Sequence, residues 1–368
     1  MKRPYDLTAS DPADESVRRI LRHLCAPLQS NIDGVFEDAD IEFLHDLRVS
    51  VRRTRTALSQ TKGVLPSSAM DSFPPEFKWL GTVTGPCRDL DVFLLAMESF
   101  RLRLGIDDGA LGPLRNFLRE KRRLEHGLVR AALQSERFQR LVEDWGRFLE
   151  TCAEEEIRPP LASTPIIEVA GPRILKAYRR MRKRGVGIDV DPPAALLHRL
   201  RIDGKRLRYL LEFFSDLFPR PTVTRFIREL KQLQDILGDF NDTGVQLALI
   251  REFTDLARIS HQLPAAASDA PHPAVFSRLG VLDVPQVRAP RPSGRKPHWA
   301  PHVAALATEP GEICGLGTTS AETPAASSRL TEAIEERQRE LRAEFSERFE
   351  LFAGDESRKL YKKTFKTT

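Results

Sequence analysis

A basic, helix-forming stretch that occurs twice is the feature that most constrains the fold of this chain. Residues 44–55 read LHDLRVSVRRTR, and residues 197–208, which lie 153 positions further on, read LHRLRIDGKRLR. Neither copy contains proline, and the spacing of the apolar residues predicts a helix for each. At about 100° per residue, an arc of roughly 80° on the first helix holds four basic side chains: His45, Arg48, Arg52 and Arg55.

This basic stripe lies beside the apolar stripe of the predicted helix, not opposite it. The neighbouring arc holds Leu44, Leu47, Val51 and Leu58. The charges of a merely solvated helix would gather on the far face. The second copy repeats the pattern with His198, Arg201, Lys205 and Arg208. Arginine and lysine both bind phosphate oxygens, so two such stripes at the edge of a core predict the walls of an anion site.

The repeat extends well beyond the two basic stretches. At the same offset Pro66 matches Pro219, Gly85 matches Gly238 and Asp89 matches Asp242, without a gap. About sixteen identities over some fifty positions indicate two copies of one unit. The alignment also predicts two further wall residues on the next helical region of each unit. They are Lys78 and Arg88 in the first unit, and Lys231 and Asn241 in the second. Asp89 and Asp242 are expected to orient the arginines.

The chain as a whole is predicted to be all-α, because no stretch shows the alternation of a β-strand. Its 368 residues allow two similar halves, each with a core of its own. Two homologous four-helix bundles related by a pseudo-twofold axis are the simplest packing, and they would bring the basic stripes together. The expected divisions are a flexible N-terminus (1–15), the first half (16–153), a linker (154–171), the second half (172–352) with a disordered insertion (261–328), and a basic tail (353–368).

Composition limits the class of protein and of site. The net charge is only +5, with a pI of about 9.1, so the clustering of basic residues matters more than their total. The four cysteines form no CxxC pair, which argues against a disulfide framework or a zinc site. No apolar run approaches membrane-spanning length and no signal segment begins the chain. A cytoplasmic protein without cofactor or metal, and without a membrane partner, is expected.

Enzymatic readings find little support in the sequence. The His45-Asp46 dipeptide could suggest a metal-dependent phosphohydrolase, but the second copy has His198-Arg199 in its place. The motifs GxxxxGK[ST], GxSxG and HExxH are all absent. Nucleic acid remains an alternative ligand, since any basic groove attracts a phosphate backbone. Aromatic residues make up only 7% of the chain, so stacking on bases is poorly supported.

These segments resemble those of the CHAD family, the conserved histidine α-helical domain. The resemblance rests on LHDLRVSVRRTR with CRDLD, and on LHRLRIDGKRLRYLLEFF with LKQLQDILGDFND. It covers the chain from about residue 16 to 352, apart from the insertion. It implies two four-helix bundles around a basic central cavity that binds inorganic polyphosphate without catalysis.

Some members of this family associate with polyphosphate granules. Others are fused to a triphosphate tunnel metalloenzyme domain, whose ExExK signature does not occur here, so a stand-alone CHAD protein is expected. Carried over by position, the resemblance implies these polyphosphate-binding residues: His45, Arg48, Arg52, Arg53, Arg55, Lys78, Arg88, His198, Arg201, Lys205, Arg206, Arg208, Lys231 and Asn241.

Overall fold

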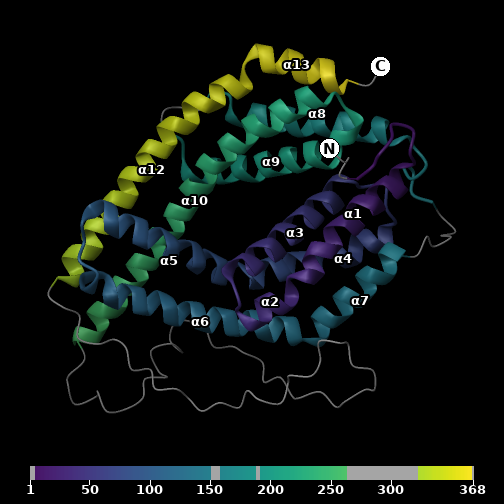
Figure 1. The fold of residues 1–368 in the computed structure, drawn as a ribbon. Helices are drawn as coiled ribbons and strands as arrows, with labels where there is room; N and C mark the ends of the chain where they lie inside the picture. Colours follow the sequence, from purple (N-terminus) through teal and green to yellow (C-terminus); the bar gives the residue numbers. More distant parts are fainter. Residues whose placement is uncertain (1–4, 151–157, 188–190, 263–321, 367–368) are drawn as a thin grey trace.

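The protein is predominantly helical in the part that the structure describes. The computed structural model describes residues 5–150, 158–187, 191–262 and 322–366 (Figure 1). Within these ranges the only β-type pairing is an isolated bridge between Pro12 and Pro165. The predicted all-α class is therefore confirmed.

The helices of the first half are α1 (Ala13–Ser30), α2 (Ile32–Glu37), α3 (Ile41–Gln60), α4 (Ser67–Val83), α5 (Gly85–Leu104), α6 (Gly112–Gln134) and α7 (Glu136–Glu150). Those of the second half are α8 (Ile166–Gly185), α9 (Ala194–Phe213), α10 (Arg220–Gln262), α12 (Thr323–Ala353) and α13 (Asp355–Phe365).

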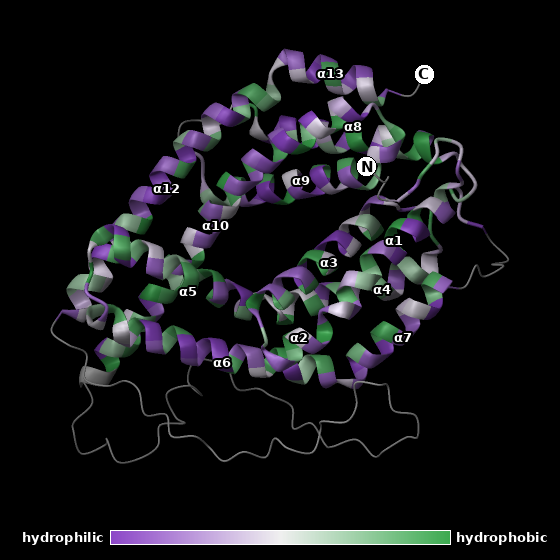
Figure 2. Cartoon of the chain, viewed as in Figure 1, coloured by the Kyte–Doolittle hydropathy of each residue, from purple (hydrophilic) through white to green (hydrophobic). Residues whose placement is uncertain are grey.

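Helices α3 and α9 contain the two basic stretches. The side chain of Asp40 caps α3 by accepting a hydrogen bond from the Glu42 N–H at 2.9 Å, which satisfies one of the free donors of the first turn. The apolar stripe predicted for α3 is buried along its whole length. Figure 2 shows hydrophilic and hydrophobic residues interspersed along both helices. The two helices contact each other, and Figure 1 shows them closest at their C-terminal ends and diverging toward their N-termini.

The two halves are joined by two hydrophobic clusters, each of which contains residues of both halves. The larger cluster includes Leu47 and Leu58 from α3, Ile174 from α8, and Leu207 and Phe213 from α9. A second cluster lies where α5 and α6 meet α10 and α12, and also contains residues of both halves. Burying one such leucine or phenylalanine contributes roughly 1.5–3 kcal/mol. The expectation of a separate core in each half is wrong, because the halves bury their apolar faces against each other.

The same sequence region folds differently in the two halves after the basic helix. In the first half Thr84 ends α4, and α5 begins at Gly85. In the second half α10 runs without a break past Gly238, the equivalent of Gly85. Pro86 occupies the start of α5, where its missing N–H costs no helical hydrogen bond and favours a new helix start.

Several predicted divisions of the chain need correction. The N-terminus is not flexible in its described part, because Tyr5 and Leu7 are buried in the core. The region 166–171, assigned to the linker, belongs to α8. The basic tail is largely a helix, α13, whose Tyr361 stacks on Tyr178 with 3.8 Å between ring centroids and whose Phe365 is buried. The prediction of a basic tail was based on the lysines of this segment. It did not take into account the two aromatic residues that the structure shows to be buried.

Most of the predicted insertion, residues 263–321, lies outside the described residues. Its two margins are helical, since α10 extends to Gln262 and α12 begins at Thr323.

Candidate functional site

Four basic side chains from α3 and α9 gather with two carboxylates where the halves meet. We call this group the basic cluster; its members are Arg48, Arg52, Asp89, Arg201, Lys205 and Asp242. Arg52 lowers the pKa values of Arg48, Arg201 and Lys205, so one α3 side chain acts on basic residues of both helices. The predicted approach of the two basic stripes is therefore present in the fold.

Arg48 is held firmly within the first half. Its Nη1 donates hydrogen bonds to the backbone oxygen of Gly81 at 3.0 Å and to Thr84 Oγ1 at 2.9 Å. Gly81 and Thr84 lie at the end of α4, where carbonyl groups lose their helical partners. Burial, with the charge of Arg52 adding to it, lowers the pKa of Arg48 to about 10. Arg48 thus connects the basic helix to the break between α4 and α5.

Arg201 and Lys205 are more weakly partnered. Within the described ranges neither side chain has a hydrogen-bond or ion-pair partner, and the Nε atom of Arg201 is buried without one, as is that of Arg52. Burial lowers the pKa of Arg201, and the carboxylate of Asp242 opposes this effect. Burial also lowers the pKa of Lys205 to about 6, with Arg201 and Arg52 adding to the shift. Desolvated cations with unused donors are disposed to accept an anion.

The two carboxylates come from equivalent positions of the repeat. Asp89 lies on α5 and Asp242 on α10, and the pKa of Asp89 is raised by burial and then by the nearby charge of Asp242. Arg48, Arg201 and Arg52 lower it, which places these cations around the carboxylates. That the aspartates orient the arginines stays a prediction. With all four basic groups charged, two positive charges remain after the carboxylates are balanced.

The two histidines occupy different environments at the margins of the cluster. His45 is half-buried, and burial, followed by the charge of Arg88, lowers its pKa. Arg88 itself donates to the backbone oxygen of Ile41 at 3.3 Å and to a carboxylate oxygen of Glu42 at 3.4 Å. His198 is exposed, and its Nδ1 lies 3.3 Å from Oδ1 of Asn241. Arg88 and Asn241 therefore both lie beside the histidine of their own half.

The structure directs two predicted site residues away from the cluster. Arg53 hydrogen-bonds the hydroxyl of Tyr5 at 3.0 Å and pairs with Glu212 at 3.3 Å. Arg206 pairs instead with Asp203 at 3.4 Å, on the side of α9 that packs against α8. Tyr5 and Glu212 lie far from Arg53 in the sequence, and Asp203 lies three residues before Arg206 but outside the basic stripe, so the stripe pattern could not reveal these partners.

The remaining predicted residues line the approaches or the surface. Arg55 is exposed and its Nη1 would lie 3.3 Å from a Cβ atom at Gly81. Arg208 pairs with Glu212 at 3.5 Å. Lys78 and Lys231 have exposed side chains on α4 and α10. They extend the basic surface and are not members of the cluster.

The structure also contains a second cluster of charged residues, which the sequence did not indicate as a site. Buried Asp203 is contacted by Arg180, Arg184 and Arg206. Asp203 stands where the first half has Ser50, so the repeat offered no signal for this cluster. The Cys87 thiol, which the CRDLD segment placed near the site, is buried, and its pKa is raised to about 12 by that burial.

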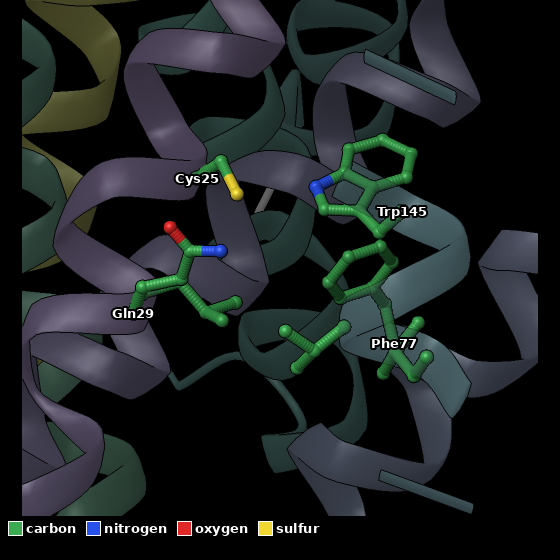
Figure 3. Close-up of a pocket in the computed structure, with 7 residues that line it drawn as sticks. Cys25, Gln29, Phe77 and Trp145 are labelled. Atoms are coloured by element: carbon green, nitrogen blue, oxygen red, sulfur yellow. The ribbon is translucent and has the colours of Figure 1, made fainter. Parts of the chain in front are cut away.

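Two pockets lie outside the cluster. A groove of about 570 Å³ is bordered by α9, α10 and α12, and its lining includes His198, Phe240, Asn241 and Arg342. A much smaller pocket lies among Cys25, Gln29, Phe77 and Trp145 (Figure 3). Its volume of about 10 Å³ has room for no more than one water molecule, so we assign it to core packing.

No group of three or more His, Cys, Asp and Glu side chains in the described residues is arranged to hold a metal ion. Among the same residues, no helix is long and apolar enough to cross a membrane.

The described part of the chain is an all-α fold in which basic side chains from both copies of the repeat come together. The chain matches the CHAD domain over residues 19–251, which is more than half of its length. It therefore belongs to the CHAD domain family, as its sequence motifs suggested.

Two solved structures show the same fold. The crystal structure of the CHAD domain from the plant Ricinus communis has 30% sequence identity and a TM-score of 0.58, and the match covers 70% of this chain and 83% of that chain. PptA from Streptomyces chartreusis has 14% identity and a TM-score of 0.61, with coverage of 92% and 100%. At that identity the likeness to PptA concerns the fold alone. A comparison with curated proteins finds no match.

Proposed function

We propose that this protein binds inorganic polyphosphate, without catalysis, through the basic cluster between its two halves. The observation that carries the proposal is the gathering of Arg48, Arg52, Arg201 and Lys205 from both copies of the repeat, with the carboxylates of Asp89 and Asp242 among them. Such desolvated like charges lower the stability of the folded protein. A bound polyanion would offset this loss.

A polymer suits the site better than a single phosphate. The basic residues belong to two helices that diverge from a common end, and exposed cations such as Arg55 and Lys78 extend the basic surface beyond the cluster. A chain of phosphates can contact several of these residues at once, and each contact releases counterions. Affinity is thus expected to increase with chain length and to fall steeply as salt concentration increases.

Binding without catalysis fits the chemistry of the cluster. Arginine and lysine hold phosphate oxygens by charge-assisted hydrogen bonds. The carboxylates Asp89 and Asp242 lie among arginines, which suits them to orient guanidinium groups. A cytoplasmic protein of this kind would accumulate where the polymer does, at polyphosphate granules.

The direct test compares ligands on the purified protein. Fluorescence anisotropy would follow the binding of long-chain polyphosphate, and competition would rank orthophosphate, pyrophosphate and single-stranded DNA at several salt concentrations. Phosphate release would be measured in parallel. We expect tight binding of long chains, weak binding of orthophosphate and no release.

A matched pair of variants locates the site. Arg52→Gln with Arg201→Gln should weaken polyphosphate binding at least tenfold. Arg140→Gln with Arg258→Gln removes the same charge from the exposed surfaces of α7 and α10 and should change it little. Equal affinity for orthophosphate and long chains, or equal losses in both double variants, would contradict the proposal. Tighter binding of DNA than of polyphosphate would favour a nucleic-acid ligand.

A further inference from the structure

Lys205 occupies an unusual position for a lysine. Arg201 lies four residues before it and Arg208 three residues after it, so all three side chains share one face of α9. Helices α3 and α10 both contact α9; from them Arg52 lowers the pKa of Lys205, after burial and Arg201, and the carboxylate of Asp242 opposes these effects. On α5, Asp89 lies near Arg201 and Arg52. Helix α8 packs on the other side of α9, where Arg180, Arg184 and Arg206 surround Asp203.

The equivalent position in the first half is Arg52, and this difference matters for protonation. A guanidinium stays charged at any physiological pH, whereas a lysine amine loses its proton when it is desolvated near other cations. The pKa of Lys205 is about 6 in the absence of ligand. Near neutral pH the free site therefore has three permanent cations and one neutral amine.

We propose that polyphosphate binding at the basic cluster is coupled to the uptake of one proton by Lys205, so that the site binds the polymer more tightly as the pH falls. This inference rests on the proposed function and adds to it a pH-dependent regulation. Each phosphate near Lys205 counteracts the charges of Arg52 and Arg201 and favours the ammonium form. The bound polymer thereby stabilises the protonated form of Lys205. This ammonium group is the fourth cation of the site and in turn binds the polymer.

The expected pH dependence follows from linkage. Binding raises the pKa of Lys205 from about 6 toward the ordinary lysine value of about 10.4. Between these two values the complex holds one more proton than the free protein, so affinity decreases by up to tenfold for each pH unit of increase. Below about pH 6 the amine is already protonated and this contribution levels off.

The experiment measures the affinity for long-chain polyphosphate at constant ionic strength between about pH 5.5 and 8.5. In a long chain the interior phosphates stay ionised over this range, so the ligand contributes little to the profile. Calorimetry in two buffers of different ionisation enthalpy would count the protons taken up. We expect close to one proton per site at pH 7.5 for the unmodified protein.

Two substitutions at position 205 separate charge from packing. Lys205→Arg places a permanent cation there, as in the first half, and should bind tightly with little pH dependence and no proton uptake. Lys205→Gln cannot take up the proton and should bind more weakly at low pH, again with a flat profile. Circular dichroism would verify that both variants are helical.

The two histidines lie at the margins of the cluster and need their own control. His45→Asn with His198→Asn removes both imidazoles and leaves Lys205 in place. If the pH dependence persists in this double variant and disappears in Lys205→Arg, Lys205 is its source. If it disappears with the histidines, or if Lys205→Arg retains the unmodified profile, the inference is wrong.

This outcome is distinguishable from failure of the proposed function. Polyphosphate binding that lacks a Lys205-dependent proton would overturn the inference alone. Absence of polyphosphate binding at every pH, in the unmodified protein and in Lys205→Arg alike, would overturn both.

Discussion

Helices α3 and α9 have nearly the same stripe of basic residues, yet their side chains have different partners. Arg48 is fixed by the Gly81 carbonyl and the Thr84 hydroxyl, whereas the equivalent Arg201 relies on the charge of Asp242. The next helix explains the contrast. It breaks at Thr84 in the first half and continues as α10 in the second, so only the first half offers Arg48 a helix end.

The basic position beside the stripe, 53 in the first half and 206 in the second, diverges further. Arg53 lies near the rings of Tyr209 and Phe213 on α9, while its equivalent Arg206 contacts Asp203. The two equivalent arginines therefore stabilise different interfaces. A duplicated sequence thus preserves the position of a charge on its helix. The role of that charge depends on the neighbouring helices, which have diverged between the two halves.

The largest effect is expected from reversing one charge in each helix. Arg52→Glu with Lys205→Glu should weaken polyphosphate binding roughly hundredfold or more, because like-charge juxtaposition replaces attraction on both walls. Each single change should weaken it by about tenfold, since the other wall remains. Binding assays at constant pH and salt would check this. The control, Arg140→Glu with Arg258→Glu, should have little effect; a comparable loss there would mean that binding follows overall charge.

The unequal partners of Arg48 and Arg201 predict unequal effects on stability. Arg48→Gln removes two hydrogen bonds at the end of α4 and should lower the free energy of unfolding by about 1–2 kcal/mol. Arg201→Gln removes a buried cation without such bonds and should leave stability unchanged or slightly higher. Urea denaturation monitored by circular dichroism measures both. Equal destabilisation would show that the break between α4 and α5 does not distinguish the two arginines.

Lys205 is expected to reduce the stability of the free protein, unlike Arg48 with its hydrogen bonds. Its pKa is about 6 in the folded protein and about 10.4 when unfolded, so between these values the unfolded chain binds more protons and stability increases with pH. The cost is therefore complete below about pH 6 and vanishes above about pH 10. Lys205→Met should raise the free energy of unfolding by several kcal/mol near pH 6, up to the roughly 6 kcal/mol that linkage gives for these two pKa values. A difference that does not shrink as the pH rises would contradict this pKa.

The smallest effect is expected from shortening the connection between helices at which the two halves differ most in length. Residues 105–111 connect α5 and α6, whereas residues 263–321 separate α10 from α12. Replacing 263–321 by a flexible linker should leave polyphosphate affinity and cooperative unfolding almost unchanged, because this segment lacks the apolar periodicity of a core helix. Thermal unfolding and the anisotropy assay test it. A broad transition or a large loss of affinity would assign the segment a structural or binding role.

Much of the fold is readable in the sequence alone. The pattern of residues 44–55 predicts a helix, and α3 spans Ile41–Gln60, because a proline-free amphipathic pattern determines a helix locally. The repeat also predicted that two basic stripes approach each other. Equivalent residues such as Asp89 and Asp242 then meet because the units that carry them pack together.

Other properties were decided only by the tertiary structure. Periodicity gives the angle at which a side chain leaves its helix, but it does not specify which helix packs there. Arg53 reaches Glu212, and α13 buries Tyr361 against Tyr178, through contacts between segments far apart in the sequence. Lys205 is a further example. The sequence predicts its position on a basic stripe, but its low pKa comes from burial and from charges that include those on neighbouring helices.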